Sequence, residues 1–419
     1  MFLLLYGTTR ARRHTIQYVI LILLSMAMQL FLCMFYTGRQ GAKKQLQDAY
    51  DEMEIECVVC NLTGTQTDDL HIKDYAVSLF YREQYARHGE LIDNPFLEHV
   101  KNVRGRCQLR YMLAEEGQAE KEQYISQTQA LIGLTDVGME TSFKTENGGS
   151  ITYREGFNEE MFGEEQPLCI VSEEFYRAKQ EQVKESVLYL AVSDTFGNRI
   201  AEQKFTVAGT YAGSGEEIYC PWNVVQELSE QLTGGMQAEA LRFTVKDNRK
   251  LGELKELLTW YFAPVDVTGG LREFEDGGVL AYYEYSVLIY DDIFLKTITQ
   301  FTNSVRVYNS IMPILFVILF SMGFLISFLF IRNRKQEFAI LRSLGTKKTE
   351  ILLELLTEQF ILSLLGIGAG LLSFALFIGA GNVLFELAGI YLVVYLIGAF
   401  MAASLFIKND VLTALAKKE

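Results

Sequence analysis

The sequence predicts a membrane protein with four transmembrane α-helices and a large α+β extracytoplasmic domain inserted between helices 1 and 2. The first observation is a conflict of composition. The 419-residue chain has a net charge of −14, yet it is 49% hydrophobic with a mean hydropathy of +0.12. A soluble acidic protein would not be net hydropathic, and a fully embedded protein would not carry 52 Asp and Glu residues, so the chain is divided between lipid and water. The negative charge also argues against nucleic acid as a partner, because such binders present basic surfaces.

Four nearly unbroken apolar runs near the two ends of the chain are the second observation. Each holds about 20 residues, which as a helix is long enough to cross the roughly 30 Å hydrocarbon layer. Over such a span in lipid a helix satisfies its own backbone groups, and no run has the alternating pattern of a barrel strand. The runs cover residues 16–35, 311–331, 360–378 and 388–407.

The first run also has the basic flank of a signal peptide, since Arg10, Arg12 and Arg13 precede it. It is longer than a usual signal core, and no small residues follow it at an A-x-A-like cleavage site. We therefore expect a retained helix.

Basic residues set the predicted orientation. The segment between the second and third runs and the C-terminal tail are rich in Lys and Arg, whereas the turn at 379–387 has neither. Because cytoplasmic loops collect Lys and Arg, we expect both termini and the basic loop in the cytoplasm of a cell-membrane protein, with residues 37–308 outside. That outer segment holds 26 Lys and Arg against 45 Asp and Glu, a net charge of −19.

Five segments follow from this topology. The outer segment is long enough to bury a core and is expected to form two lobes. The predicted segments are 1–36 (cytoplasmic N-terminus and helix 1), 37–290 (outer domain), 291–333 (stalk and helix 2), 334–350 (cytoplasmic coupling helix) and 351–419 (helices 3 and 4 with the tail).

The outer domain has short stretches rich in β-branched and aromatic residues and a few helical patterns, which together predict an α+β fold. A glycine-rich turn at 146–150 is expected to divide the lobes. Predicted strands are 54–60, 75–80, 130–134, 168–171, 186–192, 204–211 and 240–245, and predicted helices are 173–185, 224–232 and 251–261.

No catalytic or metal-binding pattern emerges. Cys57 and Cys60 have the spacing of a redox or zinc pair, but no second pair exists and the chain has only 4 His. The pair also falls in an apparent strand rather than at a helix start that would activate it. We interpret the cysteines as small buried hydrophobes, with one disulfide left open.

An apolar repeat precedes the second run. Its members recur every 3.5 residues, which is the seam of a helix that packs on another helix. The repeat enters the membrane run without a glycine break, so one helix of about 40 residues, roughly 60 Å long, is predicted. The seam comprises Phe294, Ile298, Phe301, Val305 and Tyr308.

The basic loop is predicted to hold a short amphipathic helix. Phe338, Leu341 and Leu344 are expected on one face, with Gly345 ending the helix and Thr346 capping the next. Such a helix could simply lie among lipid headgroups.

The loop resembles the FtsX-like permease family of ABC transporters. The family signature is an acidic residue, I-L-R-x-L-G, a small or hydroxyl residue, a basic pair, a Glu at the next membrane helix and a glycine-rich continuation. These are Glu337, residues 340–345, Thr346, residues 347–348, Glu358, and Gly366 with Gly370. Segments 156–163, 168–172 and 217–222 are similar to the outer domain of MacB-type members.

The resemblance implies a permease subunit without a conventional pore. Two such subunits, identical or paralogous, would pair, and a separate ABC ATPase carrying ATP and Mg would dock beneath them; no cofactor is expected on this chain. The stalk would carry the movement outwards. The resemblance assigns Glu337, Phe338, Leu341, Arg342, Leu344, Gly345 and Thr346 to ATPase coupling, and Glu358, Gly366 and Gly370 to membrane-helix packing.

Three functions stay open. The first is export or extraction of a peptide, antibiotic or lipid-linked substrate, which the large outer domain favours. The second is an ATPase-driven regulator that controls a cell-wall enzyme or senses a peptide. The third is a substrate-binding membrane protein without an ATPase. The cores of the second and third runs lack charged residues, which favours mechanotransmission over a polar pathway through the membrane.

Overall fold

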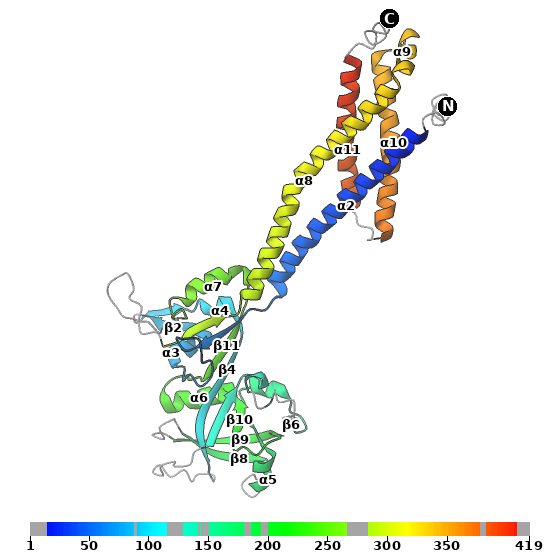
Figure 1. Cartoon of the computed structure of the whole chain (residues 1–419). Coiled ribbons are helices and arrows are strands. Elements are labelled where there is room, and N and C mark those ends of the chain that lie inside the picture. Colours follow the sequence, from blue (N-terminus) through cyan, green and yellow to red (C-terminus); the bar gives the residue numbers. More distant parts are fainter. Residues whose placement is uncertain are drawn as a thin grey trace. The chain divides into compact units, whose positions relative to one another are not determined.

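The protein is described here by a computed structural model that covers residues 15–87, 90–114, 129–140, 143, 151–179, 186–193, 200–265, 284–377 and 383–408 (Figure 1). The basic flank at residues 10–13 and the expected lobe boundary at 146–150 lie outside these residues. The chain divides into a membrane unit, Met1–Ala49 with Lys296–Glu419, and an outer unit, Tyr50–Leu295. The division falls within helix α2 (Thr15–Glu52) and within helix α8 (Asp292–Asn333).

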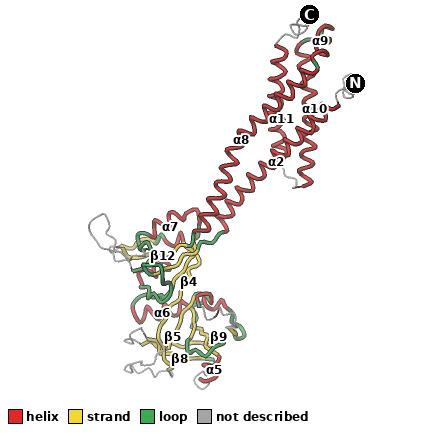
Figure 2. Tube along the Cα trace, in the orientation of Figure 1, coloured by secondary structure: helices red, strands yellow, loops and turns green. Residues whose placement is uncertain are grey.

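The described part of the membrane unit is helical (Figure 2). Besides α2 and α8 it contains α9 (Lys335–Ser343), α10 (Lys348–Phe377) and α11 (Val383–Lys408). All but α9 are long and apolar enough to cross a membrane, so the described residues contain four candidate spans, as the sequence predicts. α2 continues well beyond the predicted end at residue 36, because the polar segment that follows is rich in the helix formers Gln, Ala and Lys.

Two glycine contacts bring the membrane helices together in parallel pairs. A Cβ on Gly366 of α10 would lie 2.5 Å from the Ser25 Cβ of α2, and one on Gly398 of α11 would lie 2.4 Å from the Phe320 carbonyl oxygen of α8. Only glycine allows such close backbone approach. Since α8 leads through α9 into α10, the pairs run in opposite directions.

One end of the bundle gathers the beginning of α2, the end of α8, α9, the beginning of α10 and the end of α11. Their buried side chains form a single cluster that includes Tyr18, Phe330, Phe338, Ile351 and Ala403. This arrangement is the alternating order of crossings that the sequence predicts.

Within the membrane unit, α2 and α8 also pack against each other beyond the apolar runs. Tyr308 lies over Gly38, and its ring meets the ring of Phe35 edge-on at 5.0 Å between centroids. Arg39 Nε donates to Asn309 Oδ1 at 2.8 Å. We call this pair of segments, residues 36–49 and 296–312, the stalk.

The outer unit is built around strand β4 (Val100–Leu113), which takes part in two sets of pairings. On one side β4 pairs with β11 (Ala240–Val245), followed by β1 (Glu56–Cys60) and β12 (Ser286–Ile289). On the other, β4 begins a closed ring of pairings. The ring continues through β5 (Gln129–Leu134), β10 (Ile218–Pro221), β7 (Leu168–Ser172), β9 (Ile200–Tyr211) and β8 (Val187–Ser193), which returns to β4.

Helices and short strands complete the outer unit. One buried cluster of the outer unit includes Ile132, Leu168, Ile170 and Tyr219. Strand β6 (Ile151–Tyr153) pairs with β9, and β2 (Gln84–Arg87) pairs with β3 (Glu90–Asp93). The helices are α3 (Asp74–Val77), α4 (Phe96–His99), α5 (Glu173–Ala178), α6 (Trp222–Thr233) and α7 (Leu251–Leu258).

The predicted strand at 75–80 is wrong. This segment forms α3 and a 3-10 turn, Ser78–Phe80, and the N–H groups of Ala76 and Val77 donate to the Lys73 carbonyl. Helix 173–185 ends at Ala178 within the described residues. The sequence also missed β4, the longest strand, although Cys107, Leu109 and Tyr111 alternate there as buried residues between polar ones.

All six cysteines are buried and none forms a disulfide. Burial raises the pKa of the Cys57 thiol to about 12 and that of Cys60 to about 11, so both remain protonated at neutral pH. The interpretation of these residues as small buried hydrophobes is therefore confirmed.

Candidate coupling site

Helix α9 is the short helix that the loop motif predicts. A left-handed glycine and a backbone hydrogen bond terminate it. Gly345 has a φ of +92°, a left-handed conformation that favours glycine, and the Thr346 N–H donates to the Leu341 carbonyl at 3.2 Å. The expectation that Thr346 caps α10 is wrong. That helix begins at Lys348, and the Glu350 carboxylate accepts from the Lys347 N–H at 3.2 Å.

The two sides of α9 have different surroundings. Phe338 is buried in the cluster at the end of the bundle, and Leu341 packs partly against that cluster. Ile340 and Leu344 are instead exposed, at 60% and 77%. The expectation that Phe338 and Leu344 share one face is wrong, because residues six apart on an α-helix point in different directions. Leu344 was assigned to ATPase coupling from the sequence, whereas its exposed apolar neighbour Ile340 was not.

Arg334 lies at the junction between α8 and α9 and is only 2% exposed. Its Nε lies 2.9 Å from Glu337 Oε2 on α9, and its Nη1 lies 2.6 Å from Glu358 Oε2 on α10. The other Glu358 oxygen accepts from the Tyr18 hydroxyl of α2. A planar guanidinium that pairs with two carboxylates through different nitrogens holds them in a defined geometry.

Two aromatic rings enclose the same guanidinium. Its central carbon lies 5.1 Å from the ring centroid of Phe330 and 5.5 Å from that of Phe338. These cation–π contacts place one ring a turn before Arg334 and one a turn after it. We call Arg334, Glu337, Glu358, Tyr18, Phe330 and Phe338 the junction cluster. Sequence reasoning counted Arg334 only as one charge of the basic loop, although its four-residue spacing from both phenylalanines marks a shared face.

The other residues of the family signature lie at separate places. Arg342 belongs to α9, but its side chain lies outside the described part of the structure. Gly366 and Gly370 face α2, where Cβ atoms would meet Ser25 and Gln29. Along the stalk seam, Ile298, Phe301, Val305 and Tyr308 are half-buried.

The outer unit anchors helix ends with a second charged group. Asn248 Nδ2 donates to the carbonyl oxygens of Tyr50 and Met53 at 3.0 and 2.6 Å, and Arg249 Nη1 lies 2.5 Å from Asp51 Oδ1. Near the start of α8, Lys255 of α7 lies 2.5 Å from Asp291 Oδ2. The seam residue Phe294 is buried and meets the Tyr50 ring edge-on at 5.7 Å. We call Asn248, Arg249 and Lys255, with these partners, the anchor cluster.

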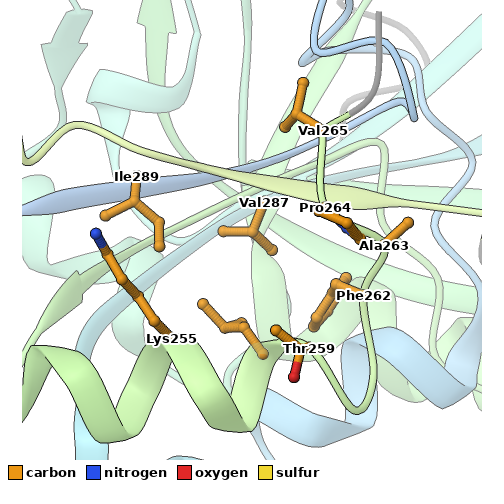
Figure 3. A pocket seen from close by; sticks show the side chains of 9 residues that line it. Lys255, Thr259, Phe262, Ala263, Pro264, Val265, Val287 and Ile289 are labelled. Atoms are coloured by element: carbon orange, nitrogen blue, oxygen red, sulfur yellow. The ribbon is translucent and has the colours of Figure 1, made fainter. Parts of the chain in front are cut away.

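The described residues also line two recesses, one in each unit. The first, of about 230 Å³ in the outer unit, lies between α7 and β12 and is lined mainly by apolar side chains such as Phe262, Val287 and Ile289 (Figure 3). It is smaller than the usual pocket for a drug-sized ligand. The second, of about 480 Å³, is an apolar groove between α10 and α11 that includes Phe360, Ile397 and Phe400. Lipid or another membrane helix suits such a surface.

These features define a multi-pass membrane protein that carries an α+β unit between its first two membrane helices. Residues 309–411, which include most of α8 and all described residues of α9, α10 and α11, match the family model of the FtsX-like permease C-terminal domain. This part of the chain is therefore similar to the FtsX-like permeases, and the family resemblance inferred from the loop is confirmed.

The solved structures that are similar to the chain include two extracytoplasmic domains of ABC-type transporters. The extracellular domain of the noncanonic ABC-type transporter YknZ from Gram-positive bacteria is 11% identical, with a TM-score of 0.28 over 56% of this chain and 99% of that one. The periplasmic region of MacB from Actinobacillus actinomycetemcomitans is 13% identical, with a TM-score of 0.26 over 59% and 94%. Both scores are low, so the fold of the outer unit rests on its own strand pairing. No curated protein matches the chain.

Proposed function

We propose that the chain is the non-catalytic permease subunit of an ABC transporter and that a separate ATPase docks on α9. The exposed apolar pair Ile340 and Leu344 carries the proposal. It lies on a helix whose opposite side is held in the bundle, which is how a binding surface for a cytoplasmic partner would be presented. This orientation requires α9 to face the cytoplasm, as its basic surroundings favour.

ATP-driven movement of α9 would reach the extracytoplasmic unit through the stalk. Both stalk helices are continuous, α2 over 38 residues and α8 over 42. The side-chain contacts between them, and the anchor cluster in the outer unit, support a mechanical role. A second permease subunit would complete the assembly and use the apolar membrane surfaces. We place the cargo among peptides, antibiotics and lipid-linked molecules, and the charge of −19 outside favours cationic members.

The test uses the full chain, purified in mild detergent from its native host. Mg-dependent ATP hydrolysis should accompany the wild-type chain. Leu344→Asp should remove most of it, because a charge replaces the apolar centre of the docking surface.

Ile293→Asp is the matched control, since Ile293 is apolar and 72% exposed but lies at the other end of α8. It should retain the ATPase. Equal hydrolysis with Leu344→Asp and wild type would contradict docking on α9, and an absence of associated ATPase from all three would contradict the proposed function.

A further inference from the structure

Packing alone does not explain why Arg334 is buried at the junction between α8 and α9. Removing a guanidinium from water is costly, and apolar residues of similar volume often serve stability as well or better. Docking does not use this side chain either, because it is 2% exposed, whereas Ile340 and Leu344 lie on the surface of the same loop. The buried charge of Arg334 is therefore better explained by a role in holding the neighbouring helices in position.

The backbone at the junction leaves the angle between α8 and α9 weakly restrained. α8 ends at Asn333 and α9 begins at Lys335, so Arg334 is the one residue between two helices. The only junction hydrogen bonds described for its backbone are the Arg334 N–H to the Ile331 carbonyl, 3.1 Å, and the Phe338 N–H to the Arg334 carbonyl, 3.2 Å. A one-residue link of this kind can bend, unless side chains fix the angle between the helices.

The side chain of Arg334 supplies such fixing contacts in several directions. Glu337 ties it to α9, and Glu358 ties it to α10 and, through the Tyr18 hydroxyl, to α2. Phe330 and Phe338 hold the guanidinium from the α8 side and the α9 side. Every membrane helix that meets at this end, apart from α11, thus contributes to one charged group.

We propose that Arg334 is a positioning residue that stiffens the junction between α8 and α9, so that a force on α9 moves α8, α10 and α2 together. The inference rests on the proposed function, because it names the part of the chain through which an ATPase would act. Without the junction cluster, the force would bend the link instead.

The first experiment needs no partner. Amide hydrogen exchange of the full chain in lipid nanodiscs is compared for wild type, Arg334→Gln and the control Arg332→Gln, which removes an exposed charge from the last turn of α8. Exchange in α9 should be on the order of tenfold faster in Arg334→Gln, with the middle of α10 unchanged, and Arg332→Gln should match wild type. Wild-type exchange in α9 of Arg334→Gln would overturn the proposal.

Glu358→Gln keeps the inference testable if Arg334→Gln fails to fold. It removes the negative charge that pairs with Arg334 while preserving side-chain volume, and α9 should again exchange faster than in wild type. Protection of α9 equal to wild type in this variant would also overturn the proposal.

A second experiment separates this inference from the proposed function. In the ATPase-associated complex, Mg-ATP with vanadate should alter exchange in the outer unit of wild type and Arg332→Gln. In Arg334→Gln the ATPase should remain bound while the outer response is lost. Loss of the ATPase from Arg334→Gln alone would place Arg334 in docking and overturn its positioning role. Absence of an ATPase from wild type would refute the proposed function, while the nanodisc comparison would still decide the junction.

Discussion

The junction cluster of the membrane unit and the anchor cluster of the outer unit perform related tasks in different surroundings. Each fixes the ends of helices with charged side chains. The Arg334 side chain is 1% exposed, whereas the side chains of Lys255 and Arg249 are 41% and 49% exposed. The junction arginine pairs with two carboxylates, and each anchor cation has one close carboxylate partner.

The difference shows that exposure, more than the number of ion pairs, determines what a charged contact can do. Water and salt screen the anchor pairs, which therefore guide helix ends at little energetic gain. Burial weakens this screening at the junction, where loss of a carboxylate partner leaves the Arg334 charge largely out of reach of water. Rigidity is expected at the junction and adjustability at the anchor.

The largest effect is expected from breaking one side of the junction cluster. Arg334→Met leaves Glu337 and Glu358 without their cation and should lower the stability of the membrane unit by about 3 kcal/mol. Glu358→Met added to it should recover part of that loss, because the two charges are then removed together. Thermal unfolding of the full chain in detergent measures both. A double variant as unstable as the sum of its single variants would show that the pair is not coupled.

A slightly smaller effect is expected within the membrane unit, where α10 crosses α2. Gly366→Ala would put a Cβ 2.8 Å from the Ile22 carbonyl oxygen, so the helices must separate at a cost of about 1–3 kcal/mol. Gly368→Ala, on the same helix with no atom within 4 Å, should leave the thermal midpoint unchanged or raise it. Equal midpoints for both variants would mean that this crossing is looser than the structure indicates.

In the anchor cluster, substitution of the neutral residue Asn248 is expected to lower stability most. Asn248→Ala removes two hydrogen bonds to the carbonyls of Tyr50 and Met53 and should cost about 1–2 kcal/mol. Hydrogen exchange at residues 50–53 of the full chain would report the loosening. Asn223→Ala, at an exposed position of α6, is the control and should leave that exchange as in wild type.

The smallest effect is expected from the exposed anchor charges. Arg249→Ala should lower the thermal midpoint less than Asn248→Ala does, and its difference from wild type should shrink further as salt rises towards about 0.5 M. The difference caused by Arg334→Met should persist over the same range. If thermal midpoints showed salt sensitivity in the junction variant instead, the contrast in exposure would not govern these clusters.

The sequence was sufficient for the features that repeat along the chain. Four apolar runs predicted four spans, and the 3.5-residue seam predicted the long helix α8. It was insufficient where partners lie far apart. The charged residues of β4 concealed a strand at the centre of the outer unit, because their role depends on pairing with β11 and β5.

The candidate site was predicted in position but not in detail. Glu337 and Glu358 were selected from the motif, yet the cation that joins them was hidden among surface charges of the same loop. Arg332 and Arg334 are the same residue type two positions apart, and only the phase of the helix decides that one is exposed and the other buried. Phe338 and Leu344 were wrongly assigned to one face of α9 for the same reason.

The pairing of β1 has a consequence for the order of assembly during synthesis. Cys57 lies opposite Phe243 on one side and Ile289 on the other. Both strands that pair with β1 therefore come from the C-terminal part of the outer unit. Contacts between such distant residues form slowly, because a long loop must close first. Residues 61–239 must therefore be synthesised before β1 can pair with β11, and its other partner, β12, directly precedes α8 in the chain.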